Sequence, residues 1–332
     1  MSTEVHGLAI NGGVMAEFEL IREYFDWSER PSTVSVGVGD DAAVLQLPNA
    51  QELVISVDTS NAGVHFPFDT PAHAVGFKSL AVNLSDLAAM GAEPAWFTLA
   101  LSLPQADKVW VSEFAKGMQE LAREHNIFLI GGDTTRGPLS ITIQVMGFAP
   151  PKQALLRSGA QQGDLICVSG TLGDAAAGLA LMQRRLNEGC LPASDANYCI
   201  QRLFYPTPRM ALGRILRHRA TACMDISDGL LADLGHLLTA SRVGARLYHA
   251  LIPSSAALRM LPLQERLEFA LTGGDDYELL FTLPPELLDT VRQEAERHVI
   301  PITVIGEIHK NLSGCVLDYQ LPNGRQGYEH FS

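Results

Sequence analysis

Residues 71–91 read PAHAVGFKSLAVNLSDLAAMG. Apolar side chains recur at helical spacing from Ala74 to Leu87, and many of the residues between them are small. Gly91 suits the end of a helix, because glycine is preferred just beyond a helix C-terminus. The segment therefore predicts a closely packed helix that carries a carboxylate, Asp86, near its C-terminal end.

On either side of this helix, short apolar runs predict strands and amphipathic runs predict further helices. In the first half of the chain the expected strands are 52–57, 96–103, 127–130 and 141–148, and the expected helices are 18–25 and 106–125. Pro150-Pro151 is the best candidate for a domain boundary. A length of 332 residues suits two domains. We expect a loose leader over 1–16, an N-terminal domain over 17–150 and a C-terminal domain over 151–332.

The second half of the chain mixes the two element types in the same way. The expected strands are 164–169, one that ends at Asp225, 277–281 and 303–308, and the expected helices are 175–186, 208–217, 230–240 and 285–297. Both domains therefore read as α/β or α+β. Residues 83–86 (NLSD) resemble 225–228 (DISD), a weak internal echo.

Bulk composition limits the possible partners. The net charge is −13, which repels nucleic acid phosphates and anionic lipid headgroups, so we expect no nucleic acid and no membrane partner. No apolar run reaches the roughly 18–20 residues that span a bilayer, and residues 1–14 lack the pattern of a signal peptide. The five cysteines are odd in number and form no C-x-x-C pair, which favours a cytoplasmic location.

Carboxylates placed at the predicted ends of elements carry the chemical signal. They are Asp40, Asp41, Asp58, Asp86, Asp133, Asp225 and Asp228. Two adjacent carboxylates repel by about 4 kcal/mol at a separation of about 4 Å and an effective dielectric constant near 20, so a cluster needs cations. Oxygen ligands favour Mg²⁺ or Ca²⁺ over softer metals. Several Mg²⁺ ions that bridge carboxylates to phosphates are the usual solution for phosphoryl transfer. Taken singly, each Asp could instead be a turn or capping residue.

Other residue types add weaker signals. Glycine turns at 37–39 and 131–132 would allow close approach to phosphates, but the chain has no P-loop and no protein-kinase motif. Among the cations, Lys78, Arg136 and Arg157 stand out. Arg157 could bind a phosphate or could be an ordinary surface residue. His65, in a loop after Asp58, could contact a substrate phosphate or simply be exposed.

The ordered set of motifs resembles the thiamine-monophosphate kinase family. The motifs are GDDAA (39–43), SVDT (56–59), AVNLSDLAAMG (81–91), GGDT (131–134), DISDGL (225–230) and GGDDYEL (273–279). They run in order from about Glu17 to Phe331. The resemblance implies the two-domain fold of aminoimidazole ribonucleotide synthetase, an N-terminal domain that pairs in a homodimer, and phosphorylation of thiamine monophosphate by ATP in the final step of thiamine diphosphate biosynthesis.

The resemblance also implies residue roles. The expected ligands of several Mg²⁺ ions are Asp41, Ser56, Val57, Asp58, Asp86, Asp133, Asp225 and Asp228. The expected ATP contacts are Gly132, Asp133, Arg157 and Ser227. The expected contacts to thiamine monophosphate are His65, Asp275 and Tyr328. No residue is expected to act as an acid or base. Val57 replaces a common Thr, so it would use its backbone carbonyl, and Asp275 replaces a common Glu.

Three alternatives remain open at this point. Sister enzymes of the same fold are one, although two of them would call for a cysteine near one end of the chain, whereas the cysteines here begin at Cys167 and end at Cys315. A non-catalytic nucleotide sensor is the second, and it would bind ATP without turnover. A metal-dependent phosphatase is the third, and it would release phosphate without an acceptor.

Overall fold

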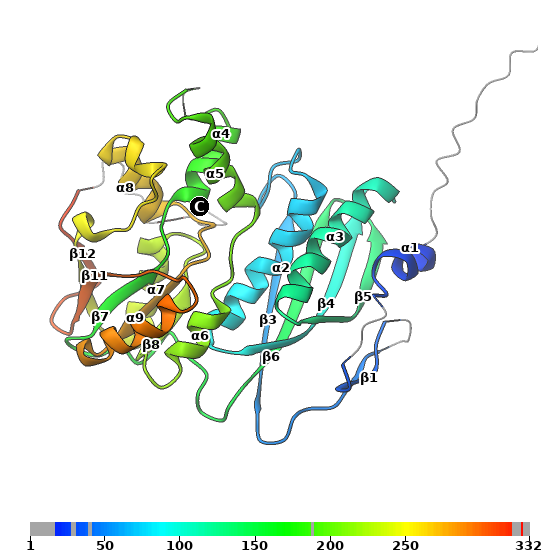
Figure 1. Cartoon of the computed structure of the whole chain (residues 1–332), viewed down its shortest axis with the longest axis horizontal. Helices are drawn as coiled ribbons and strands as arrows, with labels where there is room; N and C mark the ends of the chain where they lie inside the picture. The colour runs from blue at the N-terminus through cyan, green and yellow to red at the C-terminus, as the bar shows by residue number, and fades with distance from the viewer. Residues whose placement is uncertain (1–16, 28–30, 39–41, 187–188, 321–326, 328–332) are drawn as a thin grey trace, which may run out of the picture.

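The computed structural model describes residues 17–27, 31–38, 42–186, 189–320 and 327. These residues build two large sheets, one from the chain before Pro150-Pro151, the proposed domain boundary, and one from the chain after it (Figure 1). A short helix, α1 (Glu17–Tyr24), and a small hairpin of β1 (Val34–Val36) and β2 (Val44–Leu45) lie beside the first sheet. The mixed α/β architecture agrees with the sequence prediction.

The first sheet has four strands in the order β3-β6-β4-β5. Their bounds are β3 (Glu52–Asn61), β4 (Glu93–Leu103), β5 (Phe128–Arg136) and β6 (Ser140–Ala149). Strands β4 and β5 are parallel and are joined by α3 (Lys108–Glu124), whereas β6 runs antiparallel to β3 and β4. Helices α2 (Ala72–Ala89) and α3 cover one face of this sheet (Figure 1).

The second sheet has six strands in the order β12-β9-β11-β7-β10-β8. Its strands are β7 (Leu165–Ser169), β8 (Ala222–Asp225), β9 (Gly244–Leu247), β10 (Leu279–Leu283), β11 (Ile302–His309) and β12 (Cys315–Leu317). The helices around it are α4 (Asp174–Met182), α5 (Ala193–Phe204), α6 (Met210–Leu216), α7 (Leu230–Ser241), α8 (Leu263–Thr272) and α9 (Leu288–Glu296). Three short 3₁₀ helices complete it, at His249–Leu251, Leu258–Met260 and Pro285–Leu287.

Helix α2 joins the two halves. Fourteen of its residues are buried, as expected for a helix that is apolar on most sides. Two glycines let α2 and α3 approach closely: a Cβ on Gly76 would lie 2.0 Å from the carbonyl oxygen of Phe114, and one on Gly117 would lie 2.0 Å from that of His73. On its other side α2 contacts α6 and β8, so one apolar core runs from the first sheet into the second.

Several element bounds differ from the sequence prediction. Strand β3 continues to Asn61, so Asp58 lies within the strand rather than at its end. Strand β5 likewise continues through Gly131, Gly132 and Asp133, which were expected to form a turn. The antiparallel neighbour β6 explains the extension of β3, because it supplies backbone partners along its whole length. Helix α4 ends at Met182, and helices α5 and α8 were not predicted.

Candidate active site

A pocket of about 990 Å³ lies at the junction of the two halves. Strand β3 contributes Asp58 to it, and α2 contributes Lys78 and Asp86. The second half contributes the end of β8, the turn before α7 and the loop before β10. Of the predicted site residues, those that line this pocket are Asp58, His65, Asp86, Arg157, Asp225, Ser227, Asp228 and Asp275.

Asp58 from β3, Asp86 from α2 and Asp225 from β8 all line this pocket. Ser56 on β3 donates a hydrogen bond to Asp86 on α2. Ser85, the residue before Asp86, donates to Oδ2 of Asp225 at 2.7 Å, which links α2 to the end of β8. The hydroxyls of Ser56 and Ser85 thereby hold one carboxylate from each half. Ser56 was predicted as a site residue, whereas Ser85 was not.

Burial and mutual repulsion dominate the electrostatics of this cluster. Burial raises the pKa of Asp58 to about 6, and the charge of Asp86 adds to the effect. Burial, followed by the charge of Asp86, raises the pKa of Asp225 to about 7. Burial also raises the pKa of Asp86, although Ser56 and Arg157 oppose the shift. A cation in the pocket would relieve these costs.

The turn before α7 is held by a residue that the sequence analysis missed. The Oδ2 atom of Asp233 accepts backbone hydrogen bonds from Ser227, Asp228 and Gly229, at 3.0, 3.1 and 3.1 Å. Asp233 lies in the first turn of α7, where acidic residues are favoured. Its spacing from Gly229 was the available signal. The turn presents Ser227 and Asp228 to the pocket.

The loop before β10 has an unusual backbone. Asp275 and Tyr277 both have left-handed conformations, with φ angles of 71° and 50°. Such conformations persist where surrounding contacts hold them. Here the backbone N–H groups of Asp275 and Tyr277 donate to Ser227 and Ile226 at 2.9 Å. The loop that carries Asp275 is thus joined directly to the turn that carries Ser227.

Among the described residues, four predicted site residues do not line the pocket: Ser56, which bonds to Asp86 in the lining, and Val57, Gly132 and Asp133. Asp133 and Gly132 lie on β5, at the opposite edge of the sheet from β3. The sheet order places three inter-strand spacings between β3 and β5, which amounts to roughly 14 Å. A Cβ on Gly132 would lie 1.8 Å from the carbonyl oxygen of Leu99, so glycine is required there by strand packing.

Strand alternation also separates the side chains by face. Asp133 pairs with Ala100, which pairs with Thr142, which pairs with Thr59. These residues share the face of the sheet that α2 does not cover, whereas Asp58 faces α2. The side chain of Val57 points to the face opposite α2 as well. The two remaining predicted residues, Asp41 and Tyr328, lie outside the described residues.

The donor set fits a magnesium ion that is shared with a ligand. Within the described part of the chain, no three His, Cys, Asp or Glu side chains converge tightly enough to enclose a metal by themselves. Magnesium is commonly held by one or two carboxylates together with substrate phosphates and water. Asp58, Asp86 and Asp225 line an open pocket and supply oxygen ligands of this kind. These three carboxylates are therefore the described side chains that could hold Mg²⁺ together with a phosphate-bearing ligand.

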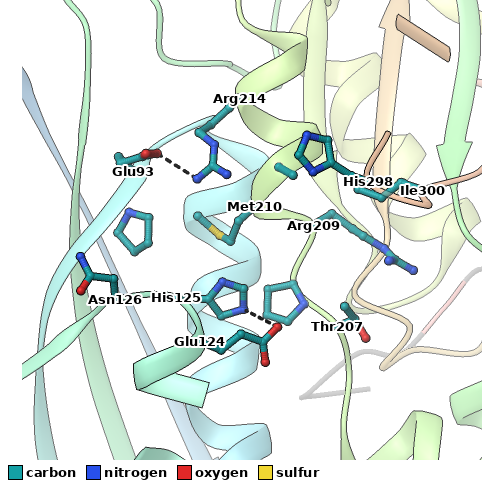
Figure 2. A pocket seen from close by; sticks show the side chains of 13 residues that line it. Glu93, Glu124, His125, Asn126, Thr207, Arg209, Met210, Arg214, His298 and Ile300 are labelled. Atoms are coloured by element: carbon teal, nitrogen blue, oxygen red, sulfur yellow. Dashed lines mark hydrogen bonds and ion pairs between the residues drawn. The ribbon is translucent and has the colours of Figure 1, made fainter. Parts of the chain in front are cut away.

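A second pocket, of about 400 Å³, lies on the same junction but has different chemistry (Figure 2). Arg214 forms an ion pair with Glu93 at 3.0 Å, and His125 lies 3.9 Å from Glu124. Its other arginine, Arg209, pairs with Glu278, and the aspartate cluster lies in the other pocket. We therefore assign the candidate active site to the larger pocket.

None of the described helices is both long enough and apolar enough to cross a bilayer.

The sequence matches two family profiles. AIR synthase related protein, N-terminal domain, matches residues 39–149, and AIR synthase related protein, C-terminal domain, matches residues 161–314. The thiamine-monophosphate kinase of Escherichia coli K12 is 48% identical over 323 residues, which cover 95% of this chain and 98% of that protein.

Two solved structures are similar to this chain along most of its length. The crystal structure of thiamine-monophosphate kinase from Stenotrophomonas maltophilia K279a is 49% identical, with a TM-score of 0.82, and the match covers 87% of this chain and 92% of that one. The structure of AaThiL complexed with AMPPCP and TMP is 32% identical, with a TM-score of 0.76, and the match covers 89% and 92% of the two chains.

Proposed function

Because this chain belongs to the thiamine-monophosphate kinase family, we propose that it transfers the γ-phosphoryl group of ATP to thiamine monophosphate, giving thiamine diphosphate and ADP. The observation that carries the proposal is the meeting of Asp58, Asp86 and Asp225 in one pocket at the junction of the halves. Support also comes from the related AaThiL, whose structure contains TMP and AMPPCP, an ATP analogue.

The proposed mechanism is direct in-line transfer. A terminal oxygen of the acceptor phosphate attacks the γ-phosphorus, the bond from phosphorus to the bridging oxygen breaks, and ADP leaves. The attacking oxygen is already ionised near neutral pH, so no side chain has to remove a proton. The chain supplies positioning and a site for charge neutralisation. Magnesium, when bound, would neutralise charge on the transferring phosphate.

Residue roles follow from this proposal. Asp58, Asp86, Asp225 and Asp228 would hold the ions, and Ser56 would orient Asp86. The backbone carbonyl of Val57 and the carboxylate of Asp41 are proposed as further ligands. Arg157 and Ser227 would contact ATP. His65, Asp275 and Tyr328 would contact thiamine monophosphate; among them, Asp275 would attract the cationic ring.

We also propose a homodimer formed through the face of the first sheet opposite α2, beside the part that the β1–β2 hairpin covers. Leu53, Ile55 and Val57 form an apolar row on β3 and are 40%, 51% and 57% exposed. Exposed apolar rows on an edge strand favour association. The proposal also accounts for Asp133 and Gly132, because a second copy could bring its β5 beside this chain's β3. Asp133 would then contribute to the site of the other subunit.

A cytoplasmic location is part of the proposal. All five cysteines are free, and Cys167, Cys199 and Cys223 are buried. Free thiols are typical of a reducing compartment.

The deciding experiment measures ADP formation by the purified protein with ATP and Mg²⁺, with and without thiamine monophosphate, and identifies products by mass. We expect ADP and thiamine diphosphate in equal amounts, and loss of both when a chelator removes the metal. Phosphate release without an acceptor would indicate a phosphatase. ATP binding without turnover would indicate a sensor or one of the sister reactions.

A further inference from the structure

Lys78 is a buried cation in the wall of the active-site pocket. It lies on α2, and its side chain is only 9% exposed. The other two cationic side chains in the lining, Arg157 and Arg185, are exposed. Lysine is rarely buried unless it is paired, so a buried lysine in a pocket calls for a partner.

The partner that the protein provides is incomplete. The Nζ atom of Lys78 lies 2.9 Å from Oδ1 of Asp275, which belongs to the other half. The approach is close enough for an ion pair but is not aligned as a hydrogen bond, and no other described residue accepts one from this ammonium. The same Oδ1 atom accepts a hydrogen bond from the hydroxyl of Tyr277 at 3.2 Å. Up to three donors of a buried ammonium therefore remain for a ligand.

The position of Lys78 along α2 matters as well. Lys78, Val82 and Asp86 follow each other at intervals of four residues, so they share one helix face, and all three line the pocket. A separation of eight residues corresponds to roughly 12 Å along the helix. Helix α2 thus carries a carboxylate beside the Asp58 and Asp225 cluster and, two turns away, a cation beside Asp275.

We infer that Lys78 binds the phosphate of the acceptor, and that its contact with Asp275 is a resting pair which the acceptor splits. This inference rests on the proposed function. Thiamine monophosphate carries an anionic phosphate and a cationic ring, so its charges complement both members of the pair. On binding, the phosphate takes the ammonium of Lys78 and the ring takes the carboxylate of Asp275. One exchange thereby recognises both ends of the acceptor.

Steady-state kinetics with two ligands test this assignment. The variants are Lys78→Met, which removes the charge, Lys78→Arg, which keeps it, and Lys116→Met as a control on the exposed surface of α3. For each variant we would measure KM for thiamine monophosphate, KM for ATP, and the inhibition constant of thiamine, which has the ring but no phosphate.

We expect Lys78→Met to raise KM for thiamine monophosphate by about tenfold to a hundredfold, the effect of losing a charge-assisted contact. KM for ATP should stay within about twofold of wild type, which is less than a single ordinary hydrogen bond contributes. The inhibition constant of thiamine should not rise, because Lys78→Met leaves Asp275 without the resting partner that the ring has to displace. Lys78→Arg should recover most of the loss. Asp275→Asn should weaken thiamine and thiamine monophosphate alike. A variant that is merely destabilised would not separate the two ligands in this way.

Three results would overturn the inference. An unchanged KM for thiamine monophosphate in Lys78→Met would make Lys78 a structural contact only. Equal weakening of thiamine and thiamine monophosphate would remove its role in reading the phosphate. For both of these results, Lys78→Gln takes the place of Lys78→Met, with the same expectation, if the Met variant does not fold. A wild-type protein that makes no ADP with this acceptor would instead overturn the proposed function, and this inference with it.

Discussion

The carboxylate of Glu278 is fully buried and accepts two hydrogen bonds from the guanidinium of Arg209, at 2.6 Å from Nε and 2.5 Å from Nη2. Arg202 donates to the same carboxylate at 2.9 Å, and Ser169 donates at 2.5 Å. Burial alone would raise the pKa of Glu278, but the two arginines outweigh it and lower the pKa. Glu278 follows the loop that carries Asp275, so this cluster fixes one end of that loop.

The buried and exposed ion pairs of the junction should differ sharply in their effect on stability. Arg209→Met leaves a buried carboxylate without its main partner, and we expect the free energy of unfolding to fall by about 3–5 kcal/mol. Arg214→Met breaks the ion pair with Glu93. The side chains of Arg214 and Glu93 are 40% and 55% exposed, so the free energy of unfolding should fall by less than about 1 kcal/mol. Urea unfolding of both variants measures the difference. Equal losses would contradict this account of Glu278.

Gly117 on α3 and Gly235 on α7 are both glycines within helices, but only Gly117 packs against another helix. Gly117→Ala would place a methyl group against the backbone of α2, and we expect a loss of about 1–3 kcal/mol from overpacking. Gly235 on α7 has no atom within 4 Å of the position of a Cβ. Gly235→Ala should therefore stabilise the protein by about 0.5–1 kcal/mol, through helix propensity alone. Thermal melts of the two variants should move in opposite directions, and a stabilising Gly117→Ala would contradict the close approach of the helices.

The carboxylate cluster predicts that stability depends on pH in the absence of ligands. The pKa of Asp58 is raised from 3.8 to about 6 in the folded protein. The folded state therefore binds this proton more tightly than the unfolded state, and its contribution to the free energy of unfolding falls as the pH rises from about 4 to about 6. Above that window, the ionised carboxylate costs stability in full.

Asp58→Asn tests this dependence in chelator-treated protein. We expect the variant to be more stable than wild type at pH 8, by on the order of 1 kcal/mol, and equal to it below about pH 4. Asp69→Asn, on the exposed surface, serves as the control. Thermal melts across the pH range measure the difference. An Asn variant that is less stable than wild type at pH 8 would show that Asp58 is not under repulsion.

How much of this site the sequence could predict depends on the range of the interactions. The helix over 72–89 and the strand that ends at Asp225 were predicted, because periodicity and short apolar runs are local signals. The grouping of Asp58, Asp86 and Asp225 came from the family resemblance. The ion pairs of Glu278 with Arg209 and Arg202 were missed, because these arginines lie 69 and 76 residues away along the chain and no local sequence pattern joins them to Glu278.

The side of the sheet on which Asp133 lies is the feature that the sequence was least able to predict. The sequence indicated a turn at residues 131–133, whereas the strand continues through them. A register shift opposite Phe97 and Thr98 skips Ile130 and so changes which side chains of β5 face α2. Because side chains alternate along a strand, a single unpaired residue reverses the outcome. Only the pairing of the strands could decide it.

The placement of Asp133 leads to a prediction about two inactive variants. Asp58→Asn and Asp133→Asn should each lower kcat strongly with Mg²⁺ and ATP. If Asp133 of one subunit serves the pocket of the other, a mixed dimer has one site that lacks both carboxylates and one site that is intact. Unfolding and refolding an equal mixture makes about half the dimers mixed, so about a quarter of wild-type activity should return.

A mixture of Asp58→Asn and Asp225→Asn is the control, because both residues line the pocket of one chain and every site in the mixed dimer keeps one lesion. Recovery in the first mixture alone would establish a shared site. No recovery in either would mean that Asp133 acts within its own chain, and the exposed apolar row on the face of the sheet opposite α2 would then need another explanation.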